Sequence, residues 1–491
     1  MLCVTGAETS LEAWNQRVAL ADERCLAAGL ARPLHELRMD TLHAIDDATF
    51  DAVRRRRAQT IVCCRPKAQG GYFGGTERER LAILRRAAAA GPAWLDAEAD
   101  LEGTELAALR STLSSGTPGT DGKLIVSWHA SSVGASDLVA RVALMAALGA
   151  DLLKVAVHVE DAAELGPLLA AFDGVTLPRV VLGMGAAGIV TRSHYRAFGS
   201  AFTYVSASDA LATAPGQFDL ETAIALGLPD SANAPVYGLC GGAQIVASPG
   251  LRVFNRYFRS HGLPSSYVPI VTRSLARTLP VLESLGAVGL SVTMPLKLEA
   301  LTLSVADELA NEVGAVNSLR LRTRWEGTNT DVLGIRGPLS MHGAPLGLER
   351  AVILGSGGAA RAALRACRDL GYDVHLHARS LDIAQAVAAG AAHVHSWASR
   401  GHAVSLGRAV LINATPISGT DNPWPDDQPL DSPLVFDTAL GEEPSSLLER
   451  AKTSGAVTLG PLAMWFSQAA AQLAWMLDVR VSSEELEGLY P

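Results

Sequence analysis

The sequence predicts an α/β protein that begins with an eight-stranded (β/α) barrel of the TIM type and continues with two further α/β domains. Two observations predict this fold class. Short β-prone runs alternate with Ala/Leu/Arg-rich helical stretches through the first half of the chain, with strand starts about 22–33 residues apart, the length of one strand-plus-helix unit. A second α/β pattern then follows a polar, proline-flanked stretch, and a third contains a glycine-rich turn.

Eight strands are expected in the first half. They start near Leu2, Pro33, Thr60, Ala93, Lys123, Leu152, Arg179 and Ala201. Helical periodicity is clearest in Glu77–Ala90 and Ala135–Leu148. Eight repeated units favour a closed parallel barrel, because that number of strands closes the sheet on itself. An open doubly wound sheet is the alternative on the rhythm alone.

We place the barrel at residues 1–229 and a linker from Pro229 to Pro235, where the chain is polar and unpatterned. A second domain is expected at residues 236–345 and a third at 346–460. Helices at residues 461–491, including the apolar Leu462–Leu477, are expected to return to the second domain. The strands expected in the third domain are Ala351–Leu354, Val374–Ala378, Val410–Asn413 and Val435–Asp437.

Composition narrows the class of protein. Hydrophobic residues make up 48% and charged residues 19% of the 491 residues, which excludes a disordered or fibrous chain. A net charge of −9 argues against nonspecific binding to nucleic acid or an anionic membrane. The longest apolar runs, such as Val180–Val190, are too short to span a bilayer. Met1–Ser10 lacks a secretory pattern and the six cysteines form no disulfide framework, so we expect a cytoplasmic protein.

Lysine 154 is the most informative polar residue of the predicted barrel. In such a barrel the reactive groups lie at the carboxyl ends of the strands. Lys154 stands inside the apolar run Leu152–Val157, where lost solvation favours a neutral, nucleophilic amine suited to forming a Schiff base. The alternative is a lysine that reaches solvent or pairs with a carboxylate. His129, one strand earlier, is placed to transfer protons.

Six short motifs surround these residues. They are Glu36-Leu-Arg-Met-Asp40, Arg65-Pro-Lys-Ala-Gln-Gly-Gly71, Ser127-Trp-His129, Lys154-Val-Ala-Val157, Thr191-Arg192 and Thr213-Ala-Pro-Gly-Gln217. Their types and order resemble type I 3-dehydroquinate dehydratase. The resemblance implies that Lys154 forms an imine with the ketone of 3-dehydroquinate and that His129 moves the protons.

The resemblance also assigns the substrate-binding residues of the first half. Arg192 and Gln217 hold the carboxylate and the loop that contains Thr213. Glu36, Arg38 and Arg65 hold the ring hydroxyls. One position departs from the family pattern, because Gln69 stands where glutamate is usual.

A glycine-rich turn in the third domain predicts a dinucleotide site. The run from Ala351 to Arg361 is a strand, a turn with Gly355, Gly357, Gly358 and Ala359, and a helix start. Such a turn lets the backbone and the helix amides approach a pyrophosphate. The next strand ends in Arg379 and Ser380, and an arginine there favours a 2′-phosphate, hence NADP over NAD. A chance glycine pattern is the alternative.

Further motifs surround this turn. They are Ser291-Val-Thr-Met-Pro-Leu-Lys297, Gly314-Ala-Val-Asn317, Gly327-Thr-Asn-Thr-Asp331, Asn413-Ala-Thr-Pro416 and Gly460–Gln468. Together they resemble shikimate dehydrogenase over about residues 236–490, a two-domain unit with a substrate-binding domain and a Rossmann-like NADP-binding domain. The resemblance implies that Lys297 and Asp331 form the catalytic pair. It also implies that Thr293, Asn317 and Gln468 bind ring hydroxyls and that Ser248 binds the carboxylate.

The two resemblances together imply a bifunctional enzyme of aromatic biosynthesis. It would dehydrate 3-dehydroquinate to 3-dehydroshikimate and reduce that ketone to shikimate with NADPH. Val246 replaces a family serine, and a family tyrosine is missing near Leu440. A dehydrogenase for a related acid such as quinate is therefore one alternative, and a non-catalytic metabolite-sensing protein is another.

No metal site is expected from the sequence. His393, His395 and His402 form a short histidine-rich stretch, but no cysteine or carboxylate nearby completes a ligand set. The expected partners are the small-molecule substrates and NADP. The sequence does not predict an oligomeric state.

Overall fold

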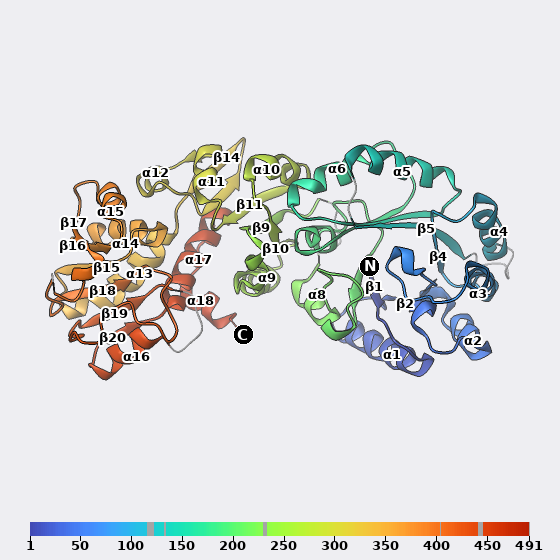
Figure 1. The fold of residues 1–491 in the computed structure, drawn as a ribbon, viewed down its shortest axis with the longest axis horizontal. Helices are drawn as coiled ribbons and strands as arrows, with labels where there is room; N and C mark the ends of the chain where they lie inside the picture. The colour runs from blue at the N-terminus through green and yellow to red at the C-terminus, as the bar shows by residue number, and fades with distance from the viewer. Residues whose placement is uncertain (115–121, 132–133, 229–232, 403, 440–444, 491) are drawn as a thin grey trace. The chain divides into compact units, whose positions relative to one another are not determined.

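The computed structural model describes residues 1–114, 122–131, 134–228, 233–402, 404–439 and 445–490 (Figure 1). By their contacts these residues form two compact units. The first contains Met1–Val288 and Met294–Leu296, and the second contains Gly289–Thr293 and Lys297–Pro491. The finer division at residues 229, 345 and 460 stays a prediction, and residues 229–232 of the predicted linker lie outside the described part of the chain.

The first unit begins with the predicted barrel. Its parallel strands follow the order β7-β6-β5-β4-β3-β2-β1-β8, and a bridge between Arg179 and Ser200 links the two ends. Every strand begins within two residues of its predicted start, which confirms the eightfold rhythm. The strands are β1 Leu2–Thr5, β2 Leu34–Arg38, β3 Thr60–Cys63, β4 Trp94–Glu98, β5 Lys123–Ala130, β6 Leu152–His158, β7 Arg179–Met184 and β8 Thr203–Ser206.

Helices connect these strands, and local sequence signals fix several of their ends. In α3 (Glu77–Ala90) a capping box joins Thr76 and Glu79 at the start, and Gly91 ends the helix with φ +69°. The other helices are α1 Leu11–Ala27, α2 Asp47–Arg55, α4 Gly103–Ser114, α5 Ala135–Ala147, α6 Leu165–Ala170, α7 Val190–Ser193 and α8 Leu220–Leu226.

Much of the barrel interior is filled by apolar side chains. Side chains from seven of the eight strands form one buried cluster, which includes Leu152 and Ala156 of β6. Because alternate residues of a strand share a face, Lys154 between them also points into the barrel. The fold therefore turns the side chain of this lysine inward, as the sequence predicts.

Six strands follow the barrel in the order β10-β9-β11-β13-β14-β12. β13 runs antiparallel to β11 and β14, while β9 and β10 pair in parallel. The strands are β9 Val236–Gly241, β10 Ser266–Val271, β11 Ala287–Val292, β12 Val305–Ala306, β13 Ser318–Leu321 and β14 Trp325–Thr328. The helices are α9 Gly250–Ser260, α10 Leu275–Ser284, α11 Lys297–Leu303, α12 Glu308–Val313 and α13 Asp331–Gly343.

The third sheet is wholly parallel and confirms the predicted Rossmann-like domain. Its order is β17-β16-β15-β18-β19-β20, so the chain reverses direction across the sheet between β15 and β18. Ligands of such sheets bind at that switch point, outside the carboxyl ends of the strands. The strands are β15 Arg350–Leu354, β16 Asp373–Ala378, β17 His393–Ser396, β18 Ala409–Asn413, β19 Leu434–Asp437 and β20 Val457–Leu459.

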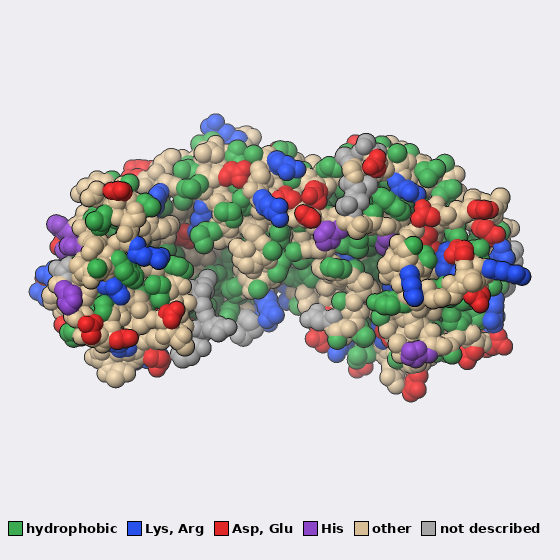
Figure 2. Space-filling model, viewed as in Figure 1, with side chains coloured by type: hydrophobic (Ala, Val, Ile, Leu, Met, Phe, Trp, Pro, Cys, Tyr) green, Lys and Arg blue, Asp and Glu red, His purple; other side chains and the backbone are tan. Residues whose placement is uncertain are grey.

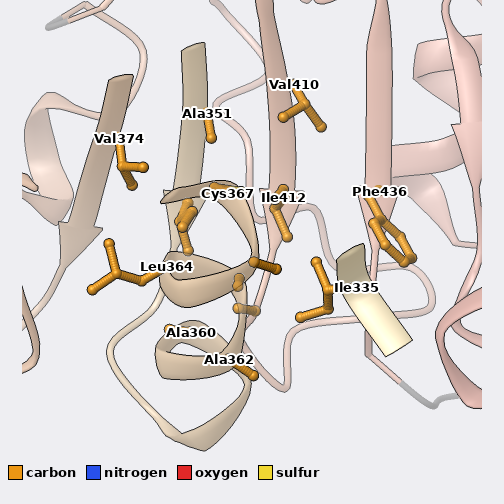
Figure 3. Close-up of a cluster of buried hydrophobic side chains, with 14 of the residues drawn as sticks. Ile335, Ala351, Ala360, Ala362, Leu364, Cys367, Val374, Val410, Ile412 and Phe436 are labelled. Carbon is orange, nitrogen blue, oxygen red and sulfur yellow. The ribbon is translucent and has the colours of Figure 1, made fainter. Parts of the chain in front are cut away.

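A dense core joins the third sheet to its helices. Figure 3 shows Val374, Ala351 and Phe436 on one face of the sheet, with Leu364 of α14 (Gly358–Asp369) and Ile335 of α13 packed against that face. The C-terminal helix α17 (Pro461–Leu477) packs closely on α13, because a Cβ at Gly334 would lie 2.8 Å from the Cβ of Gln468. The remaining helices are α15 Leu381–Ala388, α16 Ser446–Thr453 and α18 Ser483–Gly488.

The described residues contain no helix with the length and apolar character needed to cross a membrane. All six cysteines are buried and unbridged.

Candidate active sites

A cavity of about 400 Å³ opens at the carboxyl ends of the barrel strands. The structure brings together on its walls all eight residues that the sequence singles out in the first half. They are Glu36, Arg38, Arg65, His129, Lys154, Arg192, Thr213 and Gln217. Their chain positions span 182 residues, from 36 to 217, and the closed arrangement of strands gathers them at one end of the barrel.

Lys154 is buried, and carboxylates surround its amino group. Its Nζ lies 2.8 Å from Oδ2 of Asp96 and 3.7 Å from Oε1 of Glu36. The same Nζ lies 4.2 Å from the ring centre of Tyr204. The surroundings of Lys154 are therefore less apolar than its strand predicts.

Asp96 connects Lys154 to the other charged groups of the site. It stands in β4 and also accepts hydrogen bonds from Arg65 Nη2 at 3.1 Å and Ser127 Oγ at 2.5 Å. Burial by itself would raise the pKa of Asp96, but the charges of Lys154 and Arg65 hold it well below the ordinary value. Asp96 therefore stays ionised and fixes two cations of the cavity in place.

His129 stands near the end of β5 and contacts a cation. Nη1 of Arg65 lies 2.5 Å from its Nδ1 and 2.7 Å from its Nε2. Removal from water, then the charges of Arg65 and Lys154, hold the pKa of His129 well below 6.5. The imidazole is therefore neutral near pH 7 and able to accept a proton.

Arg192 is a buried cation with no carboxylate partner among the described residues. Its Nη1 donates to the carbonyl oxygen of Tyr204 at 3.4 Å, and its Nε has no hydrogen-bond partner in the described part of the chain. Burial lowers the pKa of Arg192 to about 10. By contrast, Arg38 pairs with Asp40, while Arg65 and Lys154 share Asp96. The cavity thus holds an uncompensated positive charge that suits an anionic ligand.

Glu36 and Arg38 form the polar wall contributed by β2. Thr5 Oγ1 donates to Oε2 of Glu36 at 2.5 Å. The guanidinium of Arg38 donates to both carboxylate oxygens of Asp40, at 2.9 and 2.5 Å. Both side chains are held in fixed positions and line the cavity, an arrangement that suits the binding of several hydroxyls.

The loop with Thr213 and Gln217 borders the same cavity. Oε1 of Gln217 accepts hydrogen bonds from Thr213 N at 2.9 Å and Thr213 Oγ1 at 3.2 Å. Gly185 N donates to the carbonyl of Pro215, and a Cβ at Gly216 would lie 2.5 Å from Gly185 O. Glycine at 216, with φ +74°, therefore allows the loop to lie against the end of β7.

The second unit brings together the two residues that the sequence predicts as its catalytic pair. Lys297 is the first residue of α11, and Asp331 is the first residue of α13. Nζ of Lys297 lies 2.5 Å from Oδ2 of Asp331, and Nδ2 of Asn317 donates to the other carboxylate oxygen at 2.8 Å. The side chains of the pair are 23% and 12% exposed, so a ligand can reach them.

The remaining residues predicted for the second half occupy several elements. Thr330 Oγ1 donates to Gln468 Oε1 at 3.4 Å and to Asn317 Oδ1 at 3.3 Å, which connects Gln468 to the residues around the pair. Thr293 is half-buried. Ser248 belongs to the first unit, where its Oγ accepts from Gly250 N at 3.3 Å, and Val246 is exposed there.

The glycine turn has the features that a dinucleotide pyrophosphate requires. Gly355 follows β15 directly, and α14 begins at Gly358 with no side chain capping its first amides. A Cβ at Gly357 or Gly358 would meet nothing within 4 Å, so the backbone is open to a ligand. Ala359 is the second residue of this helix.

Two side chains after β16 complete the candidate cofactor site. Arg379 is exposed and forms no ion pair with any described residue, while Ser380 is the N-cap of α15. An exposed guanidinium and a hydroxyl at this position can bind a phosphate on the 2′ oxygen of a ribose. The residues present therefore fit NADP.

Comparison with known proteins places each half. Residues 18–226 match the family described as type I 3-dehydroquinase, and residues 241–319 match the shikimate dehydrogenase substrate binding domain. A bifunctional 3-dehydroquinate dehydratase/shikimate dehydrogenase of Arabidopsis thaliana is 28% identical over 92% of this chain and 78% of its own length. The shikimate biosynthesis protein AroDE of Chlamydia pneumoniae is 27% identical over 90% of each chain.

A third relative covers the second half alone. The shikimate dehydrogenase (NADP(+)) of Thermosynechococcus vestitus is 34% identical over 44% of this chain and 81% of its own length. The chain joins a member of the type I 3-dehydroquinase family to a member of the shikimate dehydrogenase family.

Within the dehydroquinase half, the structure shows what replaces the usual glutamate. Gln69 lines the cavity, but its Nε2 donates to Oδ2 of Asp100 at 2.6 Å. Arg65 is the charged neighbour of His129 instead. The tuning of His129 by a carboxylate at position 69 is therefore absent from this chain, and a cation acts on the ring.

Sequence reasoning missed several residues of both halves. In the dehydroquinase half it missed Asp96 and Tyr204, although a carboxylate inside the apolar strand β4 was a usable signal. In the shikimate dehydrogenase half it missed Gln472, which accepts from Ser291 Oγ at 2.6 Å and donates to Asn317 O at 3.0 Å. Leu440, where a family tyrosine is missing, lies outside the described residues.

Proposed function

We propose that this chain catalyses two consecutive reactions of aromatic biosynthesis. The dehydroquinase half dehydrates 3-dehydroquinate to 3-dehydroshikimate, and the shikimate dehydrogenase half reduces that ketone to shikimate with NADPH. One observation carries the proposal: a single barrel cavity holds a buried lysine, a neutral histidine and an arginine without a carboxylate partner among the described residues. In a keto acid the ketone can react with the lysine, the carbon beside the ketone can lose a proton to the histidine, and the carboxylate can pair with the arginine.

Lys154 is the nucleophile of the dehydration. Its amine adds to the ketone carbon of 3-dehydroquinate, and the carbonyl oxygen leaves as water to form a protonated imine. Neutral His129 on the same wall is the base available to accept protons from the lysine. Asp96 and Glu36 favour a cation at Nζ, so they also stabilise the positively charged imine.

His129 then acts as base and acid in the elimination. It removes a proton from the carbon beside the imine, and the imine accepts the electron pair that this step releases. The hydroxyl on the next carbon leaves as water after the protonated histidine returns a proton to it. Hydrolysis of the imine restores Lys154 and releases 3-dehydroshikimate, so the net change is the loss of one water.

Arg192 binds the substrate carboxylate. A buried guanidinium that lacks a counter-charge is costly, and a carboxylate ligand removes that cost. Glu36, Arg38 and Arg65 face the ring hydroxyls, while Thr213 and Gln217 close the loop over the ring. These contacts fix the orientation of the ketone toward Lys154.

In the shikimate dehydrogenase half, Lys297 and Asp331 manage the proton of the reacting hydroxyl. The ion pair holds the lysine in position beside the substrate, and Lys297 donates a proton as the ketone oxygen becomes an alcohol. Bound NADPH supplies the hydride. Gly355, Gly357, Gly358 and Ala359 would hold its pyrophosphate, and Arg379 and Ser380 would hold its 2′-phosphate. Thr293, Asn317 and Gln468 bind the ring hydroxyls of the substrate.

We also propose that the chain works in the cytoplasm on small molecules alone. Six buried and unbridged cysteines suit a reducing compartment, and the net charge of −9 disfavours nucleic acid as a partner.

A coupled assay tests the function. The full chain is mixed with 3-dehydroquinate and NADPH, and NADPH oxidation is followed together with the products. We expect the unchanged chain to form shikimate. The K154M variant should no longer oxidise NADPH when given 3-dehydroquinate but should still do so when given 3-dehydroshikimate. The K297M variant should accumulate 3-dehydroshikimate. Direct reduction of 3-dehydroquinate to quinate by the K154M variant would overturn the assignment of the second half.

A further inference from the structure

Four histidines form a cluster at the edge of the third sheet. His375 and His377 stand on β16, and His393 and His395 stand on the edge strand β17. The register pairs His375 with His393 and His377 with His395. Because alternate residues share a face, all four rings lie on the same side of the sheet. Figure 2 shows histidine side chains on the surface where Figure 1 places β16 and β17.

The fold adds the carboxylate that the sequence stretch lacks. Asp373 begins β16, and its Oδ2 lies 3.1 Å from Nε2 of His375 while its Oδ1 lies 3.2 Å from Nε2 of His393. Two ligand atoms of a tetrahedral ion bound at about 2.0–2.1 Å are about 3.3 Å apart. The candidate ligand atoms of Asp373, His375 and His393 all lie within 4.8 Å of one another.

We propose that Asp373, His375 and His393 bind one divalent transition-metal ion, with water at the open position. Two imidazoles and a carboxylate are donors that Zn²⁺, Ni²⁺ and Co²⁺ accept. The side chains of Asp373 and His393 are 52% and 65% exposed, so an ion can enter and His393 can move toward it. The His375 side chain is 14% exposed and anchors the site against the sheet.

His395 orients the buried ligand of this site. Nδ1 of His375 lies 3.0 Å from Nε2 of His395, so it can donate its proton there and leave Nε2 of His375 free to coordinate. The ring of His395 stacks on that of His377 at 4.7 Å, and His377 is fully buried. The two histidines that are not ligands thus fix the ring of His375.

The place of the cluster indicates a structural role for the ion. On the next strand inward the positions in register with His375 and His377 are Val352 and Leu354, so the histidines continue an apolar row to the sheet edge. Asp373 lies at the amino end of β16, whereas Arg379 and the glycine turn lie at the carboxyl ends of the strands. The ion would tie the four-residue edge strand β17 to β16 and take no part in hydride transfer.

Metal titration of the full chain tests this site. Zn²⁺ binding is measured by calorimetry, and Co²⁺ is used as a spectroscopic probe of coordination. We expect one ion per chain, a visible Co²⁺ absorption band and a higher unfolding temperature with Zn²⁺. H393A and D373N should weaken binding at least tenfold, and H395A by about 10–100-fold.

H402A is the matched control, because His402 is an exposed histidine of the same region outside the cluster. It should bind Zn²⁺ as the unchanged chain does. Unchanged NADPH-linked reduction of 3-dehydroshikimate shows that each variant is folded. Absence of saturable binding to the unchanged chain, or an equal loss of affinity in H402A and H393A, would overturn the proposal.

Discussion

The two candidate active sites differ in how far their charged groups are buried and in how those groups are paired. In the dehydroquinase half, Lys154 and Arg192 are 4% and 1% exposed, and buried carboxylates pair with three of the four cations. In the shikimate dehydrogenase half, the Lys297–Asp331 pair is partly exposed and Asn317 is its polar neighbour. A covalent intermediate requires an enclosed, desolvated lysine, whereas a proton donor for hydride transfer needs only a positioned one.

This contrast predicts that the barrel site depends on its supporting charges more than the reductase site does. Each half also serves as the folding control for the other, because both reactions can be assayed on one chain.

Loss of the nucleophile should have the largest effect. K154M should lower the dehydration rate by about 10⁴-fold or more, because no other group can form the imine. Reduction of 3-dehydroshikimate by the same variant should be unchanged. K123M is the matched control, since Lys123 is an exposed lysine of the neighbouring strand. A K154M variant that retains a tenth of the dehydration rate would contradict the mechanism.

The corresponding change in the other half should cost less. D331N should reduce the NADPH-linked rate by about 10²–10⁴-fold, the usual contribution of a positioned acid or base, and leave dehydration intact. D307N is the control, because Asp307 only caps α12 through a bond to Ala310 N at 2.8 Å. Asparagine caps a helix about as well as aspartate, so we expect D307N to cost little folding free energy and no rate.

Asp96 should act as a positioning residue of the barrel. D96N should slow dehydration by about 10–100-fold and lower the free energy of unfolding by about 3–5 kcal/mol, because two buried cations lose their carboxylate. The pH profile of dehydration should also shift toward lower pH, since the charge of Asp96 raises the pKa of His129 and D96N removes that charge.

S127A is the control for Asp96, because it removes only the hydrogen bond to Oδ1. Its expected cost is about 1 kcal/mol without a shift of the profile. Equal pH profiles for D96N and the unchanged chain would show that Asp96 is merely structural.

The pH dependence of dehydration should report the surroundings of His129. Because its pKa lies well below 6.5, the base is still neutral at pH 6.5 and the rate should hold as pH falls through that value. R65M removes the closest cation, raises the pKa of His129 and should move the acid limb to higher pH. If the dehydration rate of the unchanged chain at pH 6.5 were half of its rate at higher pH, this account would be contradicted.

The smallest effect concerns acid stability. Burial lowers the pKa of both His35 and His194 to about 4, below the value near 6.5 expected in the unfolded chain. The unfolded state therefore binds protons first, and stability present above pH 6.5 is lost as pH falls toward 4. We expect about 1 kcal/mol of loss for each histidine between pH 7 and 6, measured by urea unfolding. H194Q should flatten this slope.

The barrel and most of its cavity could be predicted from the sequence because strand rhythm is local. The repeat length fixes the number of strands, and alternation in β6 turns Lys154 inward. Contacts between strands could not be predicted in the same way. The pairing of Lys154 with Asp96 depends on the arrangement of β4 to β6, and the contact of Arg65 with His129 depends on how the segment after β3 meets the end of β5.

The histidine cluster shows the same limit. Asp373 and His393 are 20 residues apart in the sequence, and only the parallel register of β16 and β17 brings them together. The sequence alone therefore gave no reason to expect a carboxylate beside these histidines. In the reductase half, short motifs located Lys297 and Asp331, whereas the part played by Gln472 appears only in the folded network.

Borohydride trapping tests the central claim most directly. The full chain is mixed with 3-dehydroquinate, treated with sodium borohydride and digested, and the peptides are weighed by mass spectrometry. The account predicts a reduced covalent adduct on Lys154 and none on Lys123. A chain that turns over 3-dehydroquinate yet yields no adduct on Lys154 would contradict it.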